Sequence, residues 1–127
     1  MASSDSEGNV VENLIEHVDD MATYVPPAHS GTRNVRLVEA GFAGAYEMVL
    51  GTVEAGGVAE RHSHATESQA MYVIAGQARV GLGDAAPGTY GPGTVFRIPP
   101  GLDHQVESLG PEPLRVLIVY SPALCRV

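Results

Sequence analysis

Two stretches of this sequence, residues 56–76 and 93–108, each begin with a glycine and carry histidine at a fixed distance from it. In the first stretch His62 and His64 are two residues apart, so on an extended strand both imidazole rings face the same side. The second stretch contributes His104. Imidazole is the commonest protein ligand for divalent transition metals, and these rings can share one ion only if distant strands meet. The chain is therefore expected to adopt a fold in which the two stretches lie side by side.

The spacing within both stretches resembles the paired sequence motifs of the cupin superfamily. In the first stretch the motif positions are, in order, Gly56, five residues, His62 and His64, four residues, Gln69, six residues and Gly76. In the second they are Gly93, five residues, Pro99, Pro100 and Gly101, two residues, His104, three residues and Ser108. The resemblance implies an all-β fold, a double-stranded β-helix or jelly-roll barrel. It is specific because two motifs occur in order and at full spacing.

The resemblance also implies a metal centre. His62, His64 and His104 take the positions of the family's histidine ligands. Gln69 stands where the family usually has a glutamate ligand. The implied cofactor is one divalent metal ion, and iron, zinc, nickel, cobalt, copper and manganese all stay open. The carboxylate of Glu67 is an alternative ligand, although it lies too close to His64 for the motif.

Short apolar stretches separated by turn residues predict the strands. The sequence contains 15 Gly and 9 Pro, which favours many short strands in a closed antiparallel barrel or jelly roll. We expect strands at residues 35–40, 45–53, 69–75, 78–82, 94–98, 104–108 and 114–120, with a brief one near 89–90. The strands at 69–75 and 78–82 flank Gly76 and Gln77, so we expect them to pair as a hairpin.

The N-terminal third has a different character from the rest of the chain. Residues 1–9 are small, polar and acidic and are expected to be disordered, before an arm at 10–34 and the barrel at 35–127. Apolar residues at helical spacing in 10–21 predict a short amphipathic helix, and an edge strand around 21–25 is the alternative. A small barrel need not use these apolar residues itself. They therefore predict a homodimer in which the arm packs on the partner's sheet edge.

Alternation along the expected strands predicts which side chains line the barrel. The same parity that turns Gln69 inward turns Tyr72 outward. Ser108 is expected either to donate a hydrogen bond behind the metal ligands or to fill space. His17 and His29 lie outside both motifs and are interpreted as surface residues. A mostly apolar pocket is expected from Met48, Leu50, Met71, Val73, Phe96 and Val106.

Composition limits the class of partner. The formal net charge of -8 argues against nucleic acid, because phosphate binding needs basic patches. No apolar run approaches the roughly 20 residues of a membrane span. The N-terminal residues lack the basic and apolar segments of a secretory signal, and the single cysteine, Cys125, rules out an intramolecular disulfide. We therefore expect a cytoplasmic protein that acts on a small molecule.

The metal site indicates the function. Neutral imidazole and amide ligands would leave the ion at its full charge, which favours an anionic or chelating substrate. We expect a metal-dependent enzyme acting on a small organic molecule. Either a dioxygenase with Fe(II) or a non-redox isomerase or cyclase with Zn(II) or a similar ion fits this site. The alternative is a non-catalytic metal- or ligand-binding or sensor protein. The sequence assigns no catalytic residue beyond the ligands.

Overall fold

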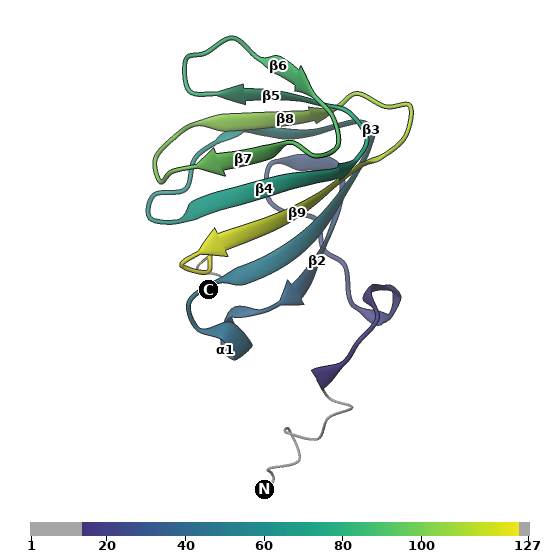
Figure 1. The fold of residues 1–127 in the computed structure, drawn as a ribbon, viewed down its shortest axis with the longest axis vertical. Helices are drawn as coiled ribbons and strands as arrows, with labels where there is room; N and C mark the ends of the chain where they lie inside the picture. The colour runs from purple at the N-terminus through teal and green to yellow at the C-terminus, as the bar shows by residue number, and fades with distance from the viewer. Residues whose placement is uncertain (1–13, 125–127) are drawn as a thin grey trace, which may run out of the picture.

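The computed structural model describes residues 14–124 and shows one antiparallel sheet that curls into a barrel (Figure 1). The sheet has eight strands, in the order β6-β5-β8-β3-β9-β4-β7, with β2 paired to β3. Their bounds are β2 (His29–Val38), β3 (Glu47–His62), β4 (Ser68–Ala75), β5 (Ala78–Leu82), β6 (Gly88–Tyr90), β7 (Val95–Ile98), β8 (His104–Ser108) and β9 (Leu114–Ser121). This arrangement confirms the all-β jelly-roll barrel that the sequence predicts.

The barrel interior is made by the inward faces of the strands. Along β4 the buried residues alternate with exposed ones, so that Gln69, Met71 and Val73 face inward while Tyr72 is 47% exposed. Strand β9 alternates in the same way and pairs with both β3 and β4. A period of two is what a sheet with one buried face requires. The alternation predicted for residues 69–75 is therefore observed.

The long strand β3 presents the face opposite to the one predicted. Val49 and Val53 are buried in the core, whereas Met48 and Leu50 lie on the outer face of β3. Glu47 shares the inward parity and is only 2% exposed, because its Oε2 lies 3.3 Å from Nε of Arg36 and its Oε1 accepts a hydrogen bond from the backbone of Leu124. Both faces of this strand carry apolar residues, so the pattern alone misassigned the pocket residues Met48 and Leu50.

The turn at Gly76 is a corner between strand layers, not a hairpin. Strand β4 pairs with β7 and β9, whereas β5 pairs with β6 and β8, so the predicted hairpin between them is wrong. Gly76 has φ +85°, and a Cβ there would lie 2.6 Å from the carbonyl oxygen of Pro113 and 2.7 Å from Cα of Leu114. Only glycine fits such a backbone approach. The chain thereby crosses from one side of the barrel to the other.

The N-terminal segment differs most from the prediction. Within the described part of the helix predicted at 10–21, the structure has only a short 3-10 helix, η2 (Val18–Asp20), and residues 10–13 lie outside the described residues. Leu14 is 61% and Ile15 is 71% exposed, and without packing so short a helix gains too little to form. The alternative edge strand is reduced to a single bridge between Tyr24 and Asn34.

Beyond this segment the sheet begins earlier than expected. Residues 29–34, assigned to the arm, form the first half of β2, and the predicted strand end at residue 40 is instead the start of a short helix, α1 (Ala40–Ala43). Cys125 lies outside the described residues. Between residues 14 and 124 the structure contains no helix long and apolar enough to cross a membrane.

Candidate metal centre

Three histidines from two separate parts of the chain meet at one end of the barrel. His62 ends β3, His64 follows in the next loop, and His104 begins β8 directly opposite His62 in the strand register. One ring nitrogen from each residue lies within 4.8 Å of the others. The ring centroids are 4.3 Å apart for His62 and His104, and 5.0 Å apart for His62 and His64. The structure thus brings together the three histidines that the two motifs carry.

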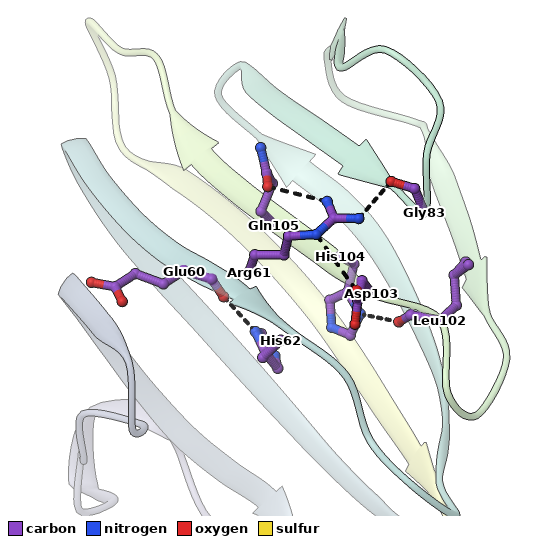
Figure 2. Close-up of polar contacts among 8 residues, drawn as sticks. All are labelled: Glu60, Arg61, His62, Gly83, Leu102, Asp103, His104 and Gln105. Atoms are coloured by element: carbon purple, nitrogen blue, oxygen red, sulfur yellow. Dashed lines mark hydrogen bonds and ion pairs between the residues drawn. The ribbon is translucent and has the colours of Figure 1, made fainter.

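Backbone carbonyls orient two of these rings. Nδ1 of His62 lies 2.6 Å from the carbonyl oxygen of Glu60, and Nδ1 of His104 lies 3.0 Å from that of Leu102 (Figure 2). A carbonyl oxygen only accepts, so in each ring Nδ1 carries the proton and donates. In the neutral form of each ring the lone pair is then on Nε2, which is the form that binds a metal ion.

Arg61 joins the two strands that carry these rings. Its Nη2 donates to the carbonyl oxygen of Gly83 at 2.6 Å, and its Nη1 donates to Oε1 of Gln105 at 3.4 Å (Figure 2). Its Nε lies 3.6 Å from a carboxylate oxygen of Asp103. Asp103 and Gln105 flank His104, Gly83 follows the end of β5, and Arg61 itself precedes His62. These contacts of Arg61 hold the end of β3 against the start of β8. Exposed ion pairs add little to the free energy of unfolding, so the main effect of these contacts is to align His62 with His104.

Gln69 lines a cavity inside the barrel that His62 and His104 also line. It is 7% exposed, at the start of β4, between Ile98 on β7 and Tyr120 on β9. Its Oε1 is buried without a hydrogen-bond partner in the described part of the chain. Buried side-chain oxygens are seldom left unpaired, so this atom fits a ligand to an ion. Glu67 lies in the loop before β4 and does not belong to the group of metal-binding side chains found among residues 14–124.

A narrow cavity of about 40 Å³ lies beside these residues. Of the predicted pocket residues, Met71 and Val106 line it, while Val73 and Phe96 belong to the core without lining it. Ser108 is 1% exposed at the far end of β8 and is absent from the cavity wall. The wall is formed by His29, Thr32, Asn34, Gly51, Val53, Ala59, His62, Gln69, Met71, His104, Val106, Leu114, Val116, Ile118 and Tyr120.

His29, interpreted from the sequence as a surface residue, is part of this wall. Its ring centroid lies 6.2 Å from that of His62. Burial, reinforced by the nearby His62 ring, lowers the pKa of His29 to about 4, so the ring is neutral at pH 7. Burial also lowers the pKa of His104, against the opposing effect of its hydrogen bond to Leu102. His17 is exposed, as expected.

Sequence reasoning also missed Thr32 and Asn34 as cavity residues. Tyr120 ends the apolar run of β9, and its ring centroid lies 5.4 Å from that of His64. Its inward position could have been read from the alternation along β9. The inward positions of His29 and Thr32 could not, because the strand between them is irregular.

The curled sheet and the three histidines at its mouth define a class, the small β-barrel proteins with a histidine cluster that could hold a metal ion. The model of the cupin domain family matches residues 49–120, more than half of the sequence, and the chain belongs to that family. A search of curated proteins found no match.

Several solved structures share most of this architecture. KdgF from Halomonas sp. is 25% identical, with a TM-score of 0.69, and the match covers 82% of this chain and 90% of that one. The polyketide cyclase RemF from Streptomyces resistomycificus is 22% identical, with a TM-score of 0.75 and coverage of 84% and 78%. A sugar phosphate isomerase of the cupin superfamily from Silicibacter pomeroyi is 23% identical, with a TM-score of 0.72 and coverage of 83% and 73%. Proteins of this fold therefore include enzymes.

Proposed function

We propose that this protein is a metal-dependent enzyme that isomerises or cyclises a small, anionic organic molecule without redox chemistry. The observation that carries the proposal is the convergence of three imidazoles within 4.8 Å of one another, two of which, His62 and His104, share a cavity with Gln69 and its buried Oε1. The fold is compatible with such chemistry, since a cyclase and an isomerase share it. Fold alone does not decide function, so the argument rests on the site.

The donor set fits a divalent ion. Nε2 of His104 and Oε1 of Gln69 are both buried and lack a hydrogen-bond partner among the described residues. The hydrogen bonds at Nδ1 leave Nε2 as the binding atom of His62 and His104. His64 and Gln69 would complete the set. A divalent ion held by these residues would supply Lewis acidity that polarises a substrate carbonyl.

The neutrality of the donors favours non-redox chemistry over dioxygenation. Non-haem Fe(II) oxygenases typically use two histidines and one carboxylate, whereas three histidines hold the Lewis-acidic zinc of enzymes such as carbonic anhydrase. Within residues 14–124 the metal-binding group contains histidines and no carboxylate. Glu67, the candidate carboxylate of the sequence, is outside it. Without that negative charge, the site favours an anionic group of the substrate.

The rest of the cavity restricts what can enter. Met71, Val106 and Ile118 give an apolar wall beside the polar donors, and such a wall keeps bulk water away from the reacting group. The cavity of about 40 Å³ is far smaller than the roughly 300–1,000 Å³ of a drug-sized ligand site. Only a small chelating head of the substrate fits inside, and its remainder must lie at the mouth.

The experiment begins with metal analysis of protein purified without added metal or chelator. The protein is then loaded with Zn(II) or Fe(II) and incubated with a panel of dicarbonyls, phenols and sugar acids, with product detection by NMR and a record of dioxygen uptake. We expect turnover by the zinc-loaded protein with no dioxygen uptake, and loss of turnover in His104→Ala. Product formation that requires iron and dioxygen would establish a dioxygenase instead. Bound metal with no turnover of any compound would favour the binding or sensor protein.

A further inference from the structure

The strand that precedes the family domain supplies a polar part of the cavity wall. The family match begins at residue 49, whereas β2 ends at Val38. From β2, the side chains of His29, Thr32 and Asn34 line the cavity that Gln69, His62 and His104 also line. Polar groups that line a largely apolar pocket are those that orient a ligand and select it. Strand β2 is therefore the place to look for recognition of the substrate.

An irregularity in β2 places His29 in the wall. His29 and Thr32 are three residues apart, so on a regular strand they would face opposite sides of the sheet. The pairing of β2 with β3 shifts register between Ser30 and Thr32, and Gly31 there has φ +65°. A Cβ at Gly31 would lie 3.0 Å from Cα of Gly57, so the backbones of β2 and β3 approach closely at this point. The bulge turns both His29 and Thr32 inward.

Hydrogen bonds fix the tautomer of His29. The hydroxyl of Thr32 donates to the carbonyl oxygen of Ser30 at 3.2 Å, and its oxygen lies 3.1 Å from Nδ1 of His29. A hydroxyl has one proton to donate, so Nδ1 of His29 must be the donor to Thr32. Nε2 of the neutral ring then has a lone pair. In the described part of the chain, the hydroxyl of Thr32 is the hydrogen-bond partner found for this ring.

We propose that Nε2 of His29 accepts a hydrogen bond from a hydroxyl group of the substrate, so that the substrate is a hydroxylated carboxylate or hydroxycarbonyl compound. This inference rests on the proposed function, because the substrate must first bind at the metal centre. His29 is not a further metal ligand, since its nitrogens do not belong to the group within 4.8 Å. Its ring centroid lies 6.2 Å from that of His62, and both side chains line the same cavity, so His29 stands next to the candidate metal centre.

The test uses Co(II)-loaded protein and two acids, D-glycerate and D-lactate. Both acids chelate through a carboxylate and the 2-hydroxyl, and glycerate alone has a further hydroxyl at carbon 3. Binding is followed through the visible absorption of the cobalt. The wild-type protein should bind glycerate more tightly than lactate by about 3- to 10-fold, the value of one neutral hydrogen bond.

Three variants sharpen the comparison. His29→Ala should lose the preference for glycerate while lactate affinity and cobalt stoichiometry stay unchanged. His29→Gln should keep part of the preference, because its amide oxygen can accept near the position of Nε2. His17→Ala, which removes an exposed histidine of the same N-terminal region, should behave like the wild type.

Equal affinities for the two acids in the wild-type protein, or an unchanged preference in His29→Ala, would overturn the inference. So would cobalt binding with no binding of either acid. Loss of cobalt from His29→Ala would also overturn it, since His29 would then be a metal ligand. Failure of the wild-type protein to bind cobalt at all would instead refute the metal centre, and with it the proposed function.

Discussion

Replacement of Gln69 by methionine should stabilise the metal-free protein and weaken metal binding at the same time. Gln69 is 7% exposed and its Oε1 has no hydrogen-bond partner among the described residues, so the metal-free fold contains an unsatisfied acceptor. Such an atom costs about 1–3 kcal/mol, and an apolar group of similar shape removes that cost. Methionine has nearly the length of glutamine and fills irregular space well. The substitution should therefore keep the packing against Ile98 and Tyr120.

The expected magnitudes are measurable. We expect the metal-free Gln69→Met protein to gain about 1–2 kcal/mol in free energy of unfolding, which for a chain of this size raises Tm by about 4–8 °C. Zinc affinity should fall by about 10- to 100-fold, as for supporting residues of metal sites. Gln69→Glu should show the reverse of both effects at pH 7. A buried carboxylate without a donor destabilises the metal-free protein, whereas its charge binds the ion more tightly and weakens binding of an anionic ligand.

The assay is urea unfolding of protein stripped by chelator, followed by calorimetric titration with Zn(II). Gln105→Met is the matched control. Gln105 accepts a hydrogen bond from Arg61 at 3.4 Å and lies outside the cavity wall, so this change should give no gain in stability and little change in zinc affinity. A metal-free Gln69→Met protein that is less stable than wild type would show that Oε1 has a structural partner. Unchanged zinc affinity in both Gln69 variants would refute its role as a ligand.

Three further predictions concern His104, His29 and the N-terminal segment. His104→Ala should remove nearly all bound metal while circular dichroism still shows the barrel, and full metal content would contradict the site. The pKa of His29 falls from 6.5 in the unfolded chain to about 4 in the folded one, so between these pH values the unfolded chain binds more protons. The free energy of unfolding of the metal-free protein, measured in urea, should therefore fall as the pH drops from about 6.5 to about 4. This fall should be smaller for the His29→Gln variant. The homodimer remains a prediction. Exposed Leu14 and Phe42 line an open groove of about 920 Å³ beside β2, where a second copy of the chain could pack. Sedimentation equilibrium should give two chains per particle, and a monomer at micromolar concentration would contradict the prediction.

The residues of the candidate metal centre could be predicted because their positions depend on short-range geometry. His62 and His64 are held a fixed distance apart on one extended segment, and His104 lies opposite His62 in the register of β3 and β8. Glycines with positive φ stand at the corners that bring the strands together, among them Gly56 at +86° and Gly101 at +83°. A motif of glycines and histidines at fixed spacing therefore encodes both the corners and the donors.

The inward face of β3 could not be predicted because its two faces differ little in hydrophobicity. Met48 and Leu50 are more apolar than Glu47 and Gly51, yet the second pair faces inward. Gly51 faces inward because the side chain of Asn34 packs against it, so closely that a Cβ at residue 51 would lie 3.0 Å from Oδ1 of Asn34. Glu47 faces inward because the side chain of Arg36 pairs with its carboxylate. Both reasons involve side chains of β2, so they depend on a pairing that alternation within one strand does not reveal.

The same dependence on pairing explains why the proposed role of His29 is harder to predict than the candidate metal centre. The three histidines of that centre lie on segments whose corners the motif specifies, but His29 faces inward only because Gly31 adopts φ +65° and the register with β3 shifts beside it. Alternation predicts faces only as far as the next irregularity, since one extra residue reverses every side chain beyond it. A change in this bulge should turn His29 outward without moving His62, His64 or His104. The proposed substrate preference should therefore change with the N-terminal strand while the candidate metal centre stays constant, and Gly31 is the residue on which this preference should depend.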